Sequence, residues 1–420
     1  MPKRILIHLQ EKARLFLRGV HLLRTVGIVC EYNPFHKGHL YLIEESRRRL
    51  GGDVTTVCVM SGDYVQRGES AFFDKFTRAE AACRCGADLV LELPLPWSLS
   101  SAEGFASGAV AILSAIGCDT IAFGSECGNL DILSRLADFA RDPFACSQIY
   151  RLMDEDSSLS FAAARERTAE TLLGPEAKIL SNANDILAVE YLKAIKGSSR
   201  EMQALAVPRK GGGHDRMDSG LYPTAMQLRE MLKRGESVSA FIPCEAMNIY
   251  AKALKTGKYK NAERFEIALL SSLYRMKAED FDKLPDAGGG AGRRLFRALQ
   301  EGSSIEKIAA SASTKRYTLA RMRRMLLCAA FGICAEDAKA EPPYLRVLAA
   351  NEKGRAHLGR MRGETPIPLL NRASEVRRLG PQAEKLFTVG ADAHELYQLQ
   401  FVTIDDRKRH EDWKTGVVLV

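Results

Sequence analysis

The sequence lacks an apolar run long enough to cross a bilayer, and it lacks paired-cysteine motifs. The longest mostly apolar stretch, residues 104–124, is interrupted by Ser107, Ser114 and Asp119, which favours a helix, a turn and a strand over a membrane span. The 10 cysteines include no Cys-x-x-Cys pair and no metal-ligand spacing. We therefore expect free thiols in a reducing cytoplasm, no protein-held metal and no membrane partner.

Residues 1–25 lack acids almost entirely, because six lysines and arginines stand against Glu11 alone. Such a composition is compatible with an amphipathic or targeting helix. The apolar centre and small-residue cleavage site of a secretory signal are missing. We expect residues 1–25 to be an extension outside the fold, with the first core strand beginning at Val26.

The rest of the chain has the composition of a soluble protein with two or three domains: 420 residues, 46% hydrophobic and 27% charged. From Val26 onward, short apolar runs alternate with helical patterns, and the runs are the expected strands, at residues 26–30, 54–60, 88–93, 120–123 and 202–207. This alternation predicts an α/β, Rossmann-like parallel sheet over residues 26–240. Residues 241–420 are expected to be mostly α-helical.

One stretch joins the first strand to its helix and carries two histidines, in the order His36-Lys37-Gly38-His39. A helix N-terminus directly after a buried strand offers unpaired N–H groups and a positive dipole end, which suits a phosphate. Imidazole donors beside it can follow the charge that develops on a phosphoryl group. The alternative is a turn glycine between two surface histidines.

Other candidate residues follow later strands, whose carboxyl ends share one rim of such a sheet. Gly124 ends the fourth strand, where a base or ribose could lie against the backbone. Arg209 and Lys210 flank a glycine-rich loop and could neutralise a triphosphate. For Arg229, in the next helix, a solvated helix face is the favoured interpretation. Residues 61–69 form either a loop that closes over a substrate or a plain polar turn.

A basic segment lies in the helical region, because residues 293–324 contain nine lysines and arginines against two acids. Lys315, Arg316, Tyr317, Arg321 and Arg324 can be placed on one helical stretch, with Tyr317, Arg321 and Arg324 on a common face. An aromatic ring among cations suits RNA, where cations meet phosphates and the ring stacks on a base. The alternative is a solvated helix face, and we slightly favour the nucleic-acid interpretation.

The stretch His36-Lys37-Gly38-His39 resembles the motif of the His-x-Gly-His nucleotidyltransferases. The longer stretch Glu31–His39 is similar to that of one branch, the bacterial tRNA(Met) cytidine acetate ligases. Further similar stretches lie at residues 60–69, 88–94, 123–126, 181–187, 224–229 and 314–318. The resemblance implies ATP-dependent activation of acetate to acetyl-adenylate. It also implies acetyl transfer to the wobble cytidine of elongator tRNA(Met), with Mg²⁺ accompanying ATP.

The resemblance also implies positions for the site, with His36 and His39 as catalytic residues. ATP contacts would fall on Val29, Cys30, Glu31, Tyr32, Asn33, Pro34, Phe35, His36, Lys37, Gly38, His39, Leu40, Tyr41, Leu42, Gly124, Asn184 and Arg209. Two departures are visible. Asn184-Asp185 stands where the family usually pairs asparagines, and Met226 and Gln227 replace hydroxyl residues of a phosphate loop found in related nucleotidyltransferases.

The preferred hypothesis is an ATP-dependent, cytoplasmic tRNA cytidine acetate ligase. Two alternatives are a small-molecule adenylyltransferase of cofactor synthesis and a non-catalytic tRNA-binding protein with a relict nucleotide fold. An adenylyltransferase would release a stable adenylylated product and would have no use for the basic helical half.

Overall fold

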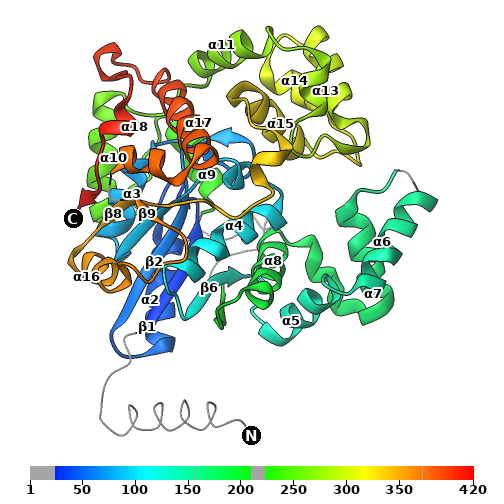
Figure 1. The fold of residues 1–420 in the computed structure, drawn as a ribbon, viewed down its shortest axis with the longest axis horizontal. Coiled ribbons are helices and arrows are strands. Elements are labelled where there is room, and N and C mark those ends of the chain that lie inside the picture. Colours follow the sequence, from blue (N-terminus) through cyan, green and yellow to red (C-terminus); the bar gives the residue numbers. More distant parts are fainter. Residues whose placement is uncertain (1–23, 157, 210–222, 371) are drawn as a thin grey trace, which may run out of the picture.

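The central sheet of the computed structural model has eight strands within the described residues, which are 24–156, 158–209, 223–370 and 372–420 (Figure 1). These strands are β1 (Arg24–Cys30), β2 (Val54–Ser61), β5 (Leu89–Leu93), β6 (Thr120–Ser125), β7 (Gln203–Pro208), β8 (Leu345–Ala350), β9 (Leu369–Leu370) and β10 (Val418–Leu419). Their order is β10-β8-β5-β2-β1-β6-β7, with β9 beside β8. The first five strands along the chain in this sheet run parallel, so the predicted parallel sheet is confirmed.

Apolar residues on both faces of these strands explain why the sheet is covered on both sides. Val57 and Leu89 face a core that includes residues of α4 (Ala102–Ala115), α5 (Leu130–Phe139) and α8 (Ala183–Gly197). Ile28 and Cys58 face a second core with α2 (Lys37–Leu50), α3 (Lys75–Arg84), α9 (Ala225–Lys233) and α10 (Cys244–Thr256). Between α5 and α8 the chain forms an outlying pair, α6 (Pro143–Glu155) and α7 (Phe161–Leu173).

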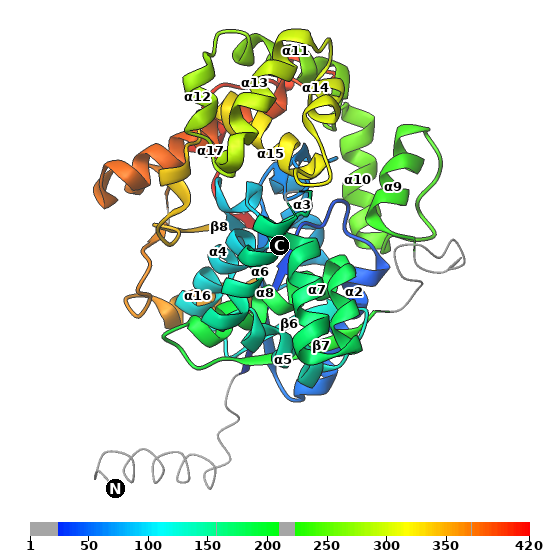
Figure 2. The ribbon, with the colours of Figure 1, turned by 90° about the vertical axis from the view of Figure 1, so that its right-hand side faces the viewer.

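A third core belongs to a helical unit that lies over the carboxyl end of the parallel strands (Figures 1 and 2). Its helices are α11 (Ala262–Leu273), α12 (Ala278–Asp282), α13 (Ala291–Glu301), α14 (Ile305–Ala312), α15 (Leu319–Phe331) and α17 (Pro381–Gln398). Tyr64, which follows β2, and Leu95 and Leu99, which follow β5, are buried in this core. The unit is therefore docked on the rim of the sheet from which the loops emerge.

The chain returns to the sheet after the helical unit, although residues 241–420 were expected to be mostly helical. β8 pairs antiparallel with β5, and β10 pairs parallel with β8. The remaining helices, α16 (Glu352–Met361) and α18 (Glu411–Lys414), belong to this returning segment. An apolar run after Pro342 and Pro343 was the available signal for β8. The expected boundary at residue 240 stays a prediction, with three strands of the central sheet coming from beyond it.

The start of the fold differs slightly from expectation. β1 begins at Arg24, which pairs with Val54, so Arg24 and Thr25 belong to the sheet rather than to the expected extension. The rest of that extension, residues 1–23, lies outside the described residues.

Among the helices that the described residues form, none combines the length and apolar character needed to span a bilayer.

Candidate active site

The two histidines of the motif cap helix α2 together. His36 is the N-cap residue, and its Nδ1 accepts the backbone N–H of Gly38 at 3.0 Å. The Nδ1 atom of His39 accepts the backbone N–H of His36 at 3.3 Å. This reciprocal arrangement is a capping box, which Ser or Thr and Glu or Gln three residues apart usually form. This capping box was not predicted, although the spacing of the two histidines before a helical pattern was a signal for it.

The hydrogen bonds of the two histidines decide which ring nitrogen carries the proton. Because each Nδ1 accepts a backbone N–H, the proton of each neutral ring lies on Nε2. Burial and the Arg209 charge lower the pKa of His36 to about 3. Burial, His36 and Arg209 hold the pKa of His39 well below its ordinary value. Both rings are therefore neutral Nε2–H donors near pH 7.

The two rings are stacked, with centroids 3.8 Å apart and an angle of 28° between their planes. A Cβ atom at Gly38 would lie 2.8 Å from Cε1 of His36, so only glycine leaves room for this ring. His36 is 7% exposed, and the alternative of two surface histidines beside a turn is wrong. Within the described part of the chain, no hydrogen bond involves either Nε2.

The loop before the histidines is held by buried side chains. Oδ1 of Asn33 accepts the backbone N–H of Phe72 at 2.7 Å, and the hydroxyl of Tyr250 accepts that of Phe35 at 3.0 Å. Tyr32 and Phe35 are 1% and 0% exposed. Their side chains therefore support the loop from within the second core. The contribution of Tyr250 was not foreseeable, because 215 residues separate it from Phe35.

Two arginines fix the backbone of this loop. Arg78 is fully buried and donates to the carbonyl oxygens of Glu31 at 2.6 Å and Ser61 at 3.1 Å, which ties the ends of β1 and β2 together. Arg229 donates to the carbonyl oxygen of Asn33 at 2.9 Å and pairs with Glu69 at 3.1 Å. Its side chain is 12% exposed, so the predicted solvated helix face is wrong for Arg229.

The remaining residues of the stretch 29–42 lie around this loop. Glu31 accepts the backbone N–H of Gln66 at 2.8 Å, and burial raises the pKa of its carboxyl. Lys37 is exposed at the start of α2. Cys30 and Pro34 are buried, whereas Val29, Leu40, Tyr41 and Leu42 are half-buried.

A second part of the site lies where β6 and β7 end. The backbone N–H of Arg209 donates to the Ser125 carbonyl oxygen at 3.1 Å. A Cβ atom at Gly124 would lie 3.4 Å from Cγ of Arg209, so this side chain covers the glycine. The charge of Arg209 also lowers the pKa of both histidines. The structure therefore brings Gly124 and Arg209 together with the histidines, whereas Lys210 lies outside the described residues.

Asp185 organises the loop after β6. Its Oδ1 accepts from the Ser125 hydroxyl at 2.5 Å and from the backbone N–H groups of Glu126 at 3.0 Å and Cys127 at 3.3 Å. Its Oδ2 accepts from Nδ2 of Asn182 at 3.0 Å. The second residue of the Asn184-Asp185 pair thus has a structural role that the sequence left open.

Asn184 reaches the same loop from the N-terminus of α8. Its Nδ2 donates to Oε1 of Glu126. The other carboxylate oxygen, Oε2, is buried without a hydrogen-bond partner among the described residues. A buried acceptor of this kind is normally satisfied by a hydrogen-bond donor, which a bound ligand can supply.

Two neighbouring segments were also singled out by their sequence. Residues 61–70 form a short hairpin of β3 (Tyr64–Val65) and β4 (Glu69–Ser70), and Gly68 packs against the backbone of Arg324. The hydroxyl of Thr224 and the side chain of Gln227 form a capping box at α9. Gln227 therefore caps helix α9, and Met226 is 48% exposed beside it.

The residues predicted to bind RNA are placed differently from expectation. Helix α15 begins at Leu319, so Lys315, Arg316 and Tyr317 precede it. Tyr317 is 9% exposed, and its hydroxyl donates to the carbonyl oxygen of Gly289. The expected common helix face with an open aromatic ring is therefore wrong, because this ring is used inside the protein.

The two arginines of that predicted face are also engaged. Arg321 donates to the Asp286 and Gly288 carbonyl oxygens and lies 4.9 Å from the centroid of Tyr317. Arg324 pairs with the Asp286 carboxylate at 3.2 Å, and its side chain is 12% exposed. A role of these residues in RNA binding stays a prediction.

The chain matches one family of known proteins over almost its whole length. The family model described as HIGH nucleotidyl transferase covers residues 23–412. The chain is 33% identical over 380 residues to tRNA(Met) cytidine acetate ligase of Syntrophotalea carbinolica, covering 86% of this chain and 89% of that protein. The protein of that name from Acetivibrio thermocellus is 31% identical over 420 residues, 95% of this chain and 100% of its own length.

Two solved structures are similar over the same extent. Thermotoga maritima TmcAL bound with alpha-thio ATP superimposes with a TM-score of 0.86 at 29% identity. The apo form of the same protein gives a TM-score of 0.88 at 27% identity. Each match covers 95% of this chain and 100% of the Thermotoga chain.

Proposed function

The chain belongs to the HIGH nucleotidyl transferase family and, within it, to the tRNA(Met) cytidine acetate ligases, and on that premise we propose how its residues perform the reaction. The protein is an ATP-dependent ligase that acts on tRNA(Met). The proposal concerns the intermediate, the acceptor base and the roles of individual side chains.

In the first step, an acetate oxygen bonds to the α-phosphorus of ATP, and diphosphate leaves with the electron pair of the broken P–O bond. The product is acetyl-adenylate. This displacement needs in-line placement of the reactants and cancellation of charge more than it needs covalent help. The protein groups have only to hold the phosphates and to follow the charge that moves toward the leaving group.

The observation that carries the proposal is the pair of neutral imidazoles at the N-terminus of α2. Their Nδ1 atoms are occupied by backbone N–H groups, which leaves two Nε2–H donors for phosphoryl oxygens. The helix dipole favours negative charge at this position, and Arg209 adds a cation. We propose that His36, His39 and Arg209 together stabilise the transition state.

The nucleoside part of ATP is proposed to lie at the end of β6. Gly124 lies at the end of this strand beneath the Arg209 side chain, and Asn184 is held toward the same loop by Glu126. The Oε2 atom of Glu126, which accepts no hydrogen bond from the described residues, is an acceptor that a ribose hydroxyl can satisfy. The backbone of residues 29–42 completes the proposed ATP site on the opposite side.

Magnesium is proposed to enter with the triphosphate of ATP. Within the described residues, no group of three or more His, Cys, Asp or Glu side chains could hold a metal ion. No step proposed for this chain depends on a protein-held ion.

In the second step, the exocyclic amine of the wobble cytidine attacks the acetyl carbon, AMP leaves with the bonding electrons, and the amine loses a proton. The product is N(4)-acetylcytidine. An anticodon loop presents this base unstacked, which is the form in which proteins reach individual RNA bases. We propose that the helical unit over the rim of the sheet contributes to binding the tRNA, with exposed Lys315 as one phosphate contact.

Incubation of the protein with ATP, radiolabelled acetate and elongator tRNA(Met) tests the proposal. We expect the label to enter the RNA, and we expect one AMP to form for each acetyl group transferred. Label in an adenylylated metabolite, or no incorporation at all, would contradict the proposal. His39→Ala should abolish acetate-dependent AMP formation while tRNA binding survives, and loss of both together would assign His39 a structural role.

A further inference from the structure

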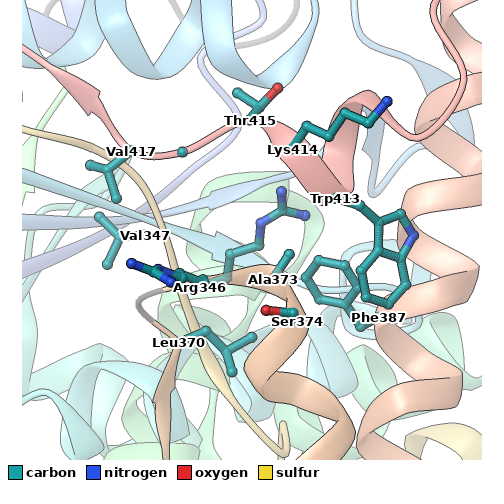
Figure 3. A pocket seen from close by; sticks show the side chains of 12 residues that line it. Arg346, Val347, Leu370, Ala373, Ser374, Phe387, Trp413, Lys414, Thr415 and Val417 are labelled. Carbon is teal, nitrogen blue, oxygen red and sulfur yellow. The ribbon is translucent and has the colours of Figure 1, made fainter.

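A cavity of about 310 Å³ lies between β8, β9 and the C-terminal segment (Figure 3). Its apolar part is formed by Val347, Leu370 and Val417, and Phe387 and Trp413 lie at one side. The volume is at the lower end of the range of ligand pockets, about 300–1,000 Å³. It has room for about one nucleotide, and its lining includes no residue of the proposed ATP site.

The polar lining of this cavity is positively charged. It contains Arg346, Arg372 and Lys414 and no aspartate or glutamate. The charge of Arg346 is neutralised by two carboxylates, because Arg346 pairs with Asp412 at 2.6 Å and with Glu92 at 3.2 Å. Two cations therefore remain to attract a ligand.

Arg372 and Lys414 are exposed. No ion pair found within the described ranges involves either of them. The nearest carboxylate on the turn of Arg372 is that of Glu375, which accepts its backbone N–H at 3.3 Å. Both cations are thus available to an anion at the cavity.

The aromatic side of the cavity suits a flat group. The rings of Phe387 and Trp413 are 4.6 Å apart at an interplanar angle of 60°, which fixes the orientation of the indole. Arg377 lies 5.4 Å from the centroid of the indole ring. Bases stack on such fixed aromatic rings with little dependence on their identity.

We propose that this cavity is a second nucleotide site, in which Arg372 and Lys414 bind a phosphate and Trp413 contacts the base. The site is separate from that of ATP, because β8 is three strands from β1, about 14 Å at the usual strand spacing. The nucleotide is either a residue of the bound RNA or a free nucleotide. If the nucleotide belongs to RNA, the inference rests on the proposed function; if it is a free nucleotide, it does not.

Fluorescence titration with cytidine monophosphate tests the site directly. The chain has two tryptophans, and Trp97 is 3% exposed, so quenching of emission reports on Trp413. We expect saturable quenching that Trp413→Phe removes. The double variant Arg372→Ala/Lys414→Ala should bind about tenfold more weakly, because two charge-assisted contacts are lost. Arg378→Ala/Lys408→Ala, which removes two exposed cations outside the cavity, is the matched control.

Titration with elongator tRNA(Met) separates the two sources. If the RNA supplies the nucleotide, the Arg372→Ala/Lys414→Ala variant should also bind tRNA more weakly and lose about one to two units of salt slope. If the source is a free nucleotide, only affinity for cytidine monophosphate falls. Equal affinities of this variant and the control for both probes would overturn the site. Acetate-dependent ATP–diphosphate exchange, measured on the same preparations, tests the proposed function independently.

Discussion

His36 and His39 lie three positions apart, and each combines a structural and a chemical task. One ring nitrogen of each caps the helix, and the other is left to donate. Capping thereby fixes the tautomer that donation to a phosphate needs. A substitution that removes both ring nitrogens abolishes helix capping and donation to the phosphate together. Asparagine keeps a capping oxygen and loses the Nε2–H donor, so it separates the two tasks.

We predict that His36→Asn and His36→Ala differ in stability and agree in activity. Asparagine is among the best N-cap residues, so its oxygen should keep the contact to Gly38, while alanine should cost about 1 kcal/mol. Both variants lose the Nε2–H donor and should form acetyl-adenylate about 10²-fold more slowly. Urea denaturation and ATP–diphosphate exchange measure the two effects. Full activity of His36→Asn would remove the donor role.

The neutral state of both imidazoles predicts an acid-labile fold. The unfolded state takes up protons near pH 6.5, whereas burial lowers the pKa of His36 in the folded state to about 3. Stability should therefore be constant above pH 6.5 and fall below it. At pH 5.5 the loss should be about 1.4 kcal/mol for His36, and His39, whose pKa is lowered as well, should add a loss of the same sign. Urea denaturation at pH 7.5 and 5.5 should show a smaller loss in His36→Asn/His39→Asn, and an equal loss would contradict this.

Asp185 accepts four hydrogen bonds, and these predict which substitutions it tolerates. Asp185→Ala leaves Ser125, Glu126 and Asn182 without their acceptor and should cost about 3 kcal/mol. Asp185→Asn should be nearly neutral, because rotation of the Asn182 amide restores a donor–acceptor pair. Thermal unfolding and the KM for ATP should be measured for both variants. An Asp185→Asn variant as unstable as Asp185→Ala would mean that the charge itself is required.

At the scale of elements, helix α15 is the part whose role the structure changes most. Two of its arginines, Arg321 and Arg324, contact the turn at residues 286–290. The hairpin tip at Gly68 packs against the same helix, where a Cβ atom would lie 2.5 Å from the backbone nitrogen of Arg324. Helix α15 thus connects the helical unit to the loop after β2.

We therefore predict that Arg321→Ala/Arg324→Ala lowers the melting temperature, because carbonyl groups of the turn lose their donors. Exposed Lys315→Ala should leave the melting temperature unchanged and weaken tRNA binding with a smaller salt slope. Calorimetry and filter binding at several salt concentrations separate the two effects. Arginine variants of unchanged stability would mean that these contacts do not hold the turn.

At the scale of the whole molecule, a buried ionic cluster joins the first half of the chain to its end. Nζ of Lys75 lies 2.9 Å from Glu92 and 2.8 Å from Asp412, and Arg346 pairs with the same two carboxylates. The side chains of Lys75 and Asp412 are 1% and 0% exposed. The C-terminal segment is therefore held against β5 by charges from three separate parts of the chain.

Removing one member should destabilise the whole fold. We expect Lys75→Met to cost about 3–5 kcal/mol, since it leaves buried carboxylates short of a partner. Lys339→Met breaks a surface pair of similar length, 2.6 Å to Glu336, and should cost less than about 1 kcal/mol. Urea denaturation compares the two variants, and equal costs would show that burial of the cluster does not matter.

Local patterns in the sequence determined the parallel sheet and the position of the motif. Apolar runs and the break at Pro34 are short-range signals, because strand and helix periodicity act between neighbouring residues. The strands β1, β2, β5, β6 and β7 and the helix after His36 could be predicted for this reason. Gly124 and Arg209 were predicted from their positions after strands, and the family resemblance added Asn184.

Only the tertiary structure decided which polar groups face a ligand and which face the protein. Arg229, Arg321 and Tyr317 look like surface or RNA-facing residues along the chain, yet each satisfies a backbone carbonyl from a distant segment. The return of β8 to the sheet, and the cavity beside it, depend on pairing across more than 250 residues. Buried polar groups need partners, and sequence periodicity does not record which distant segment supplies them.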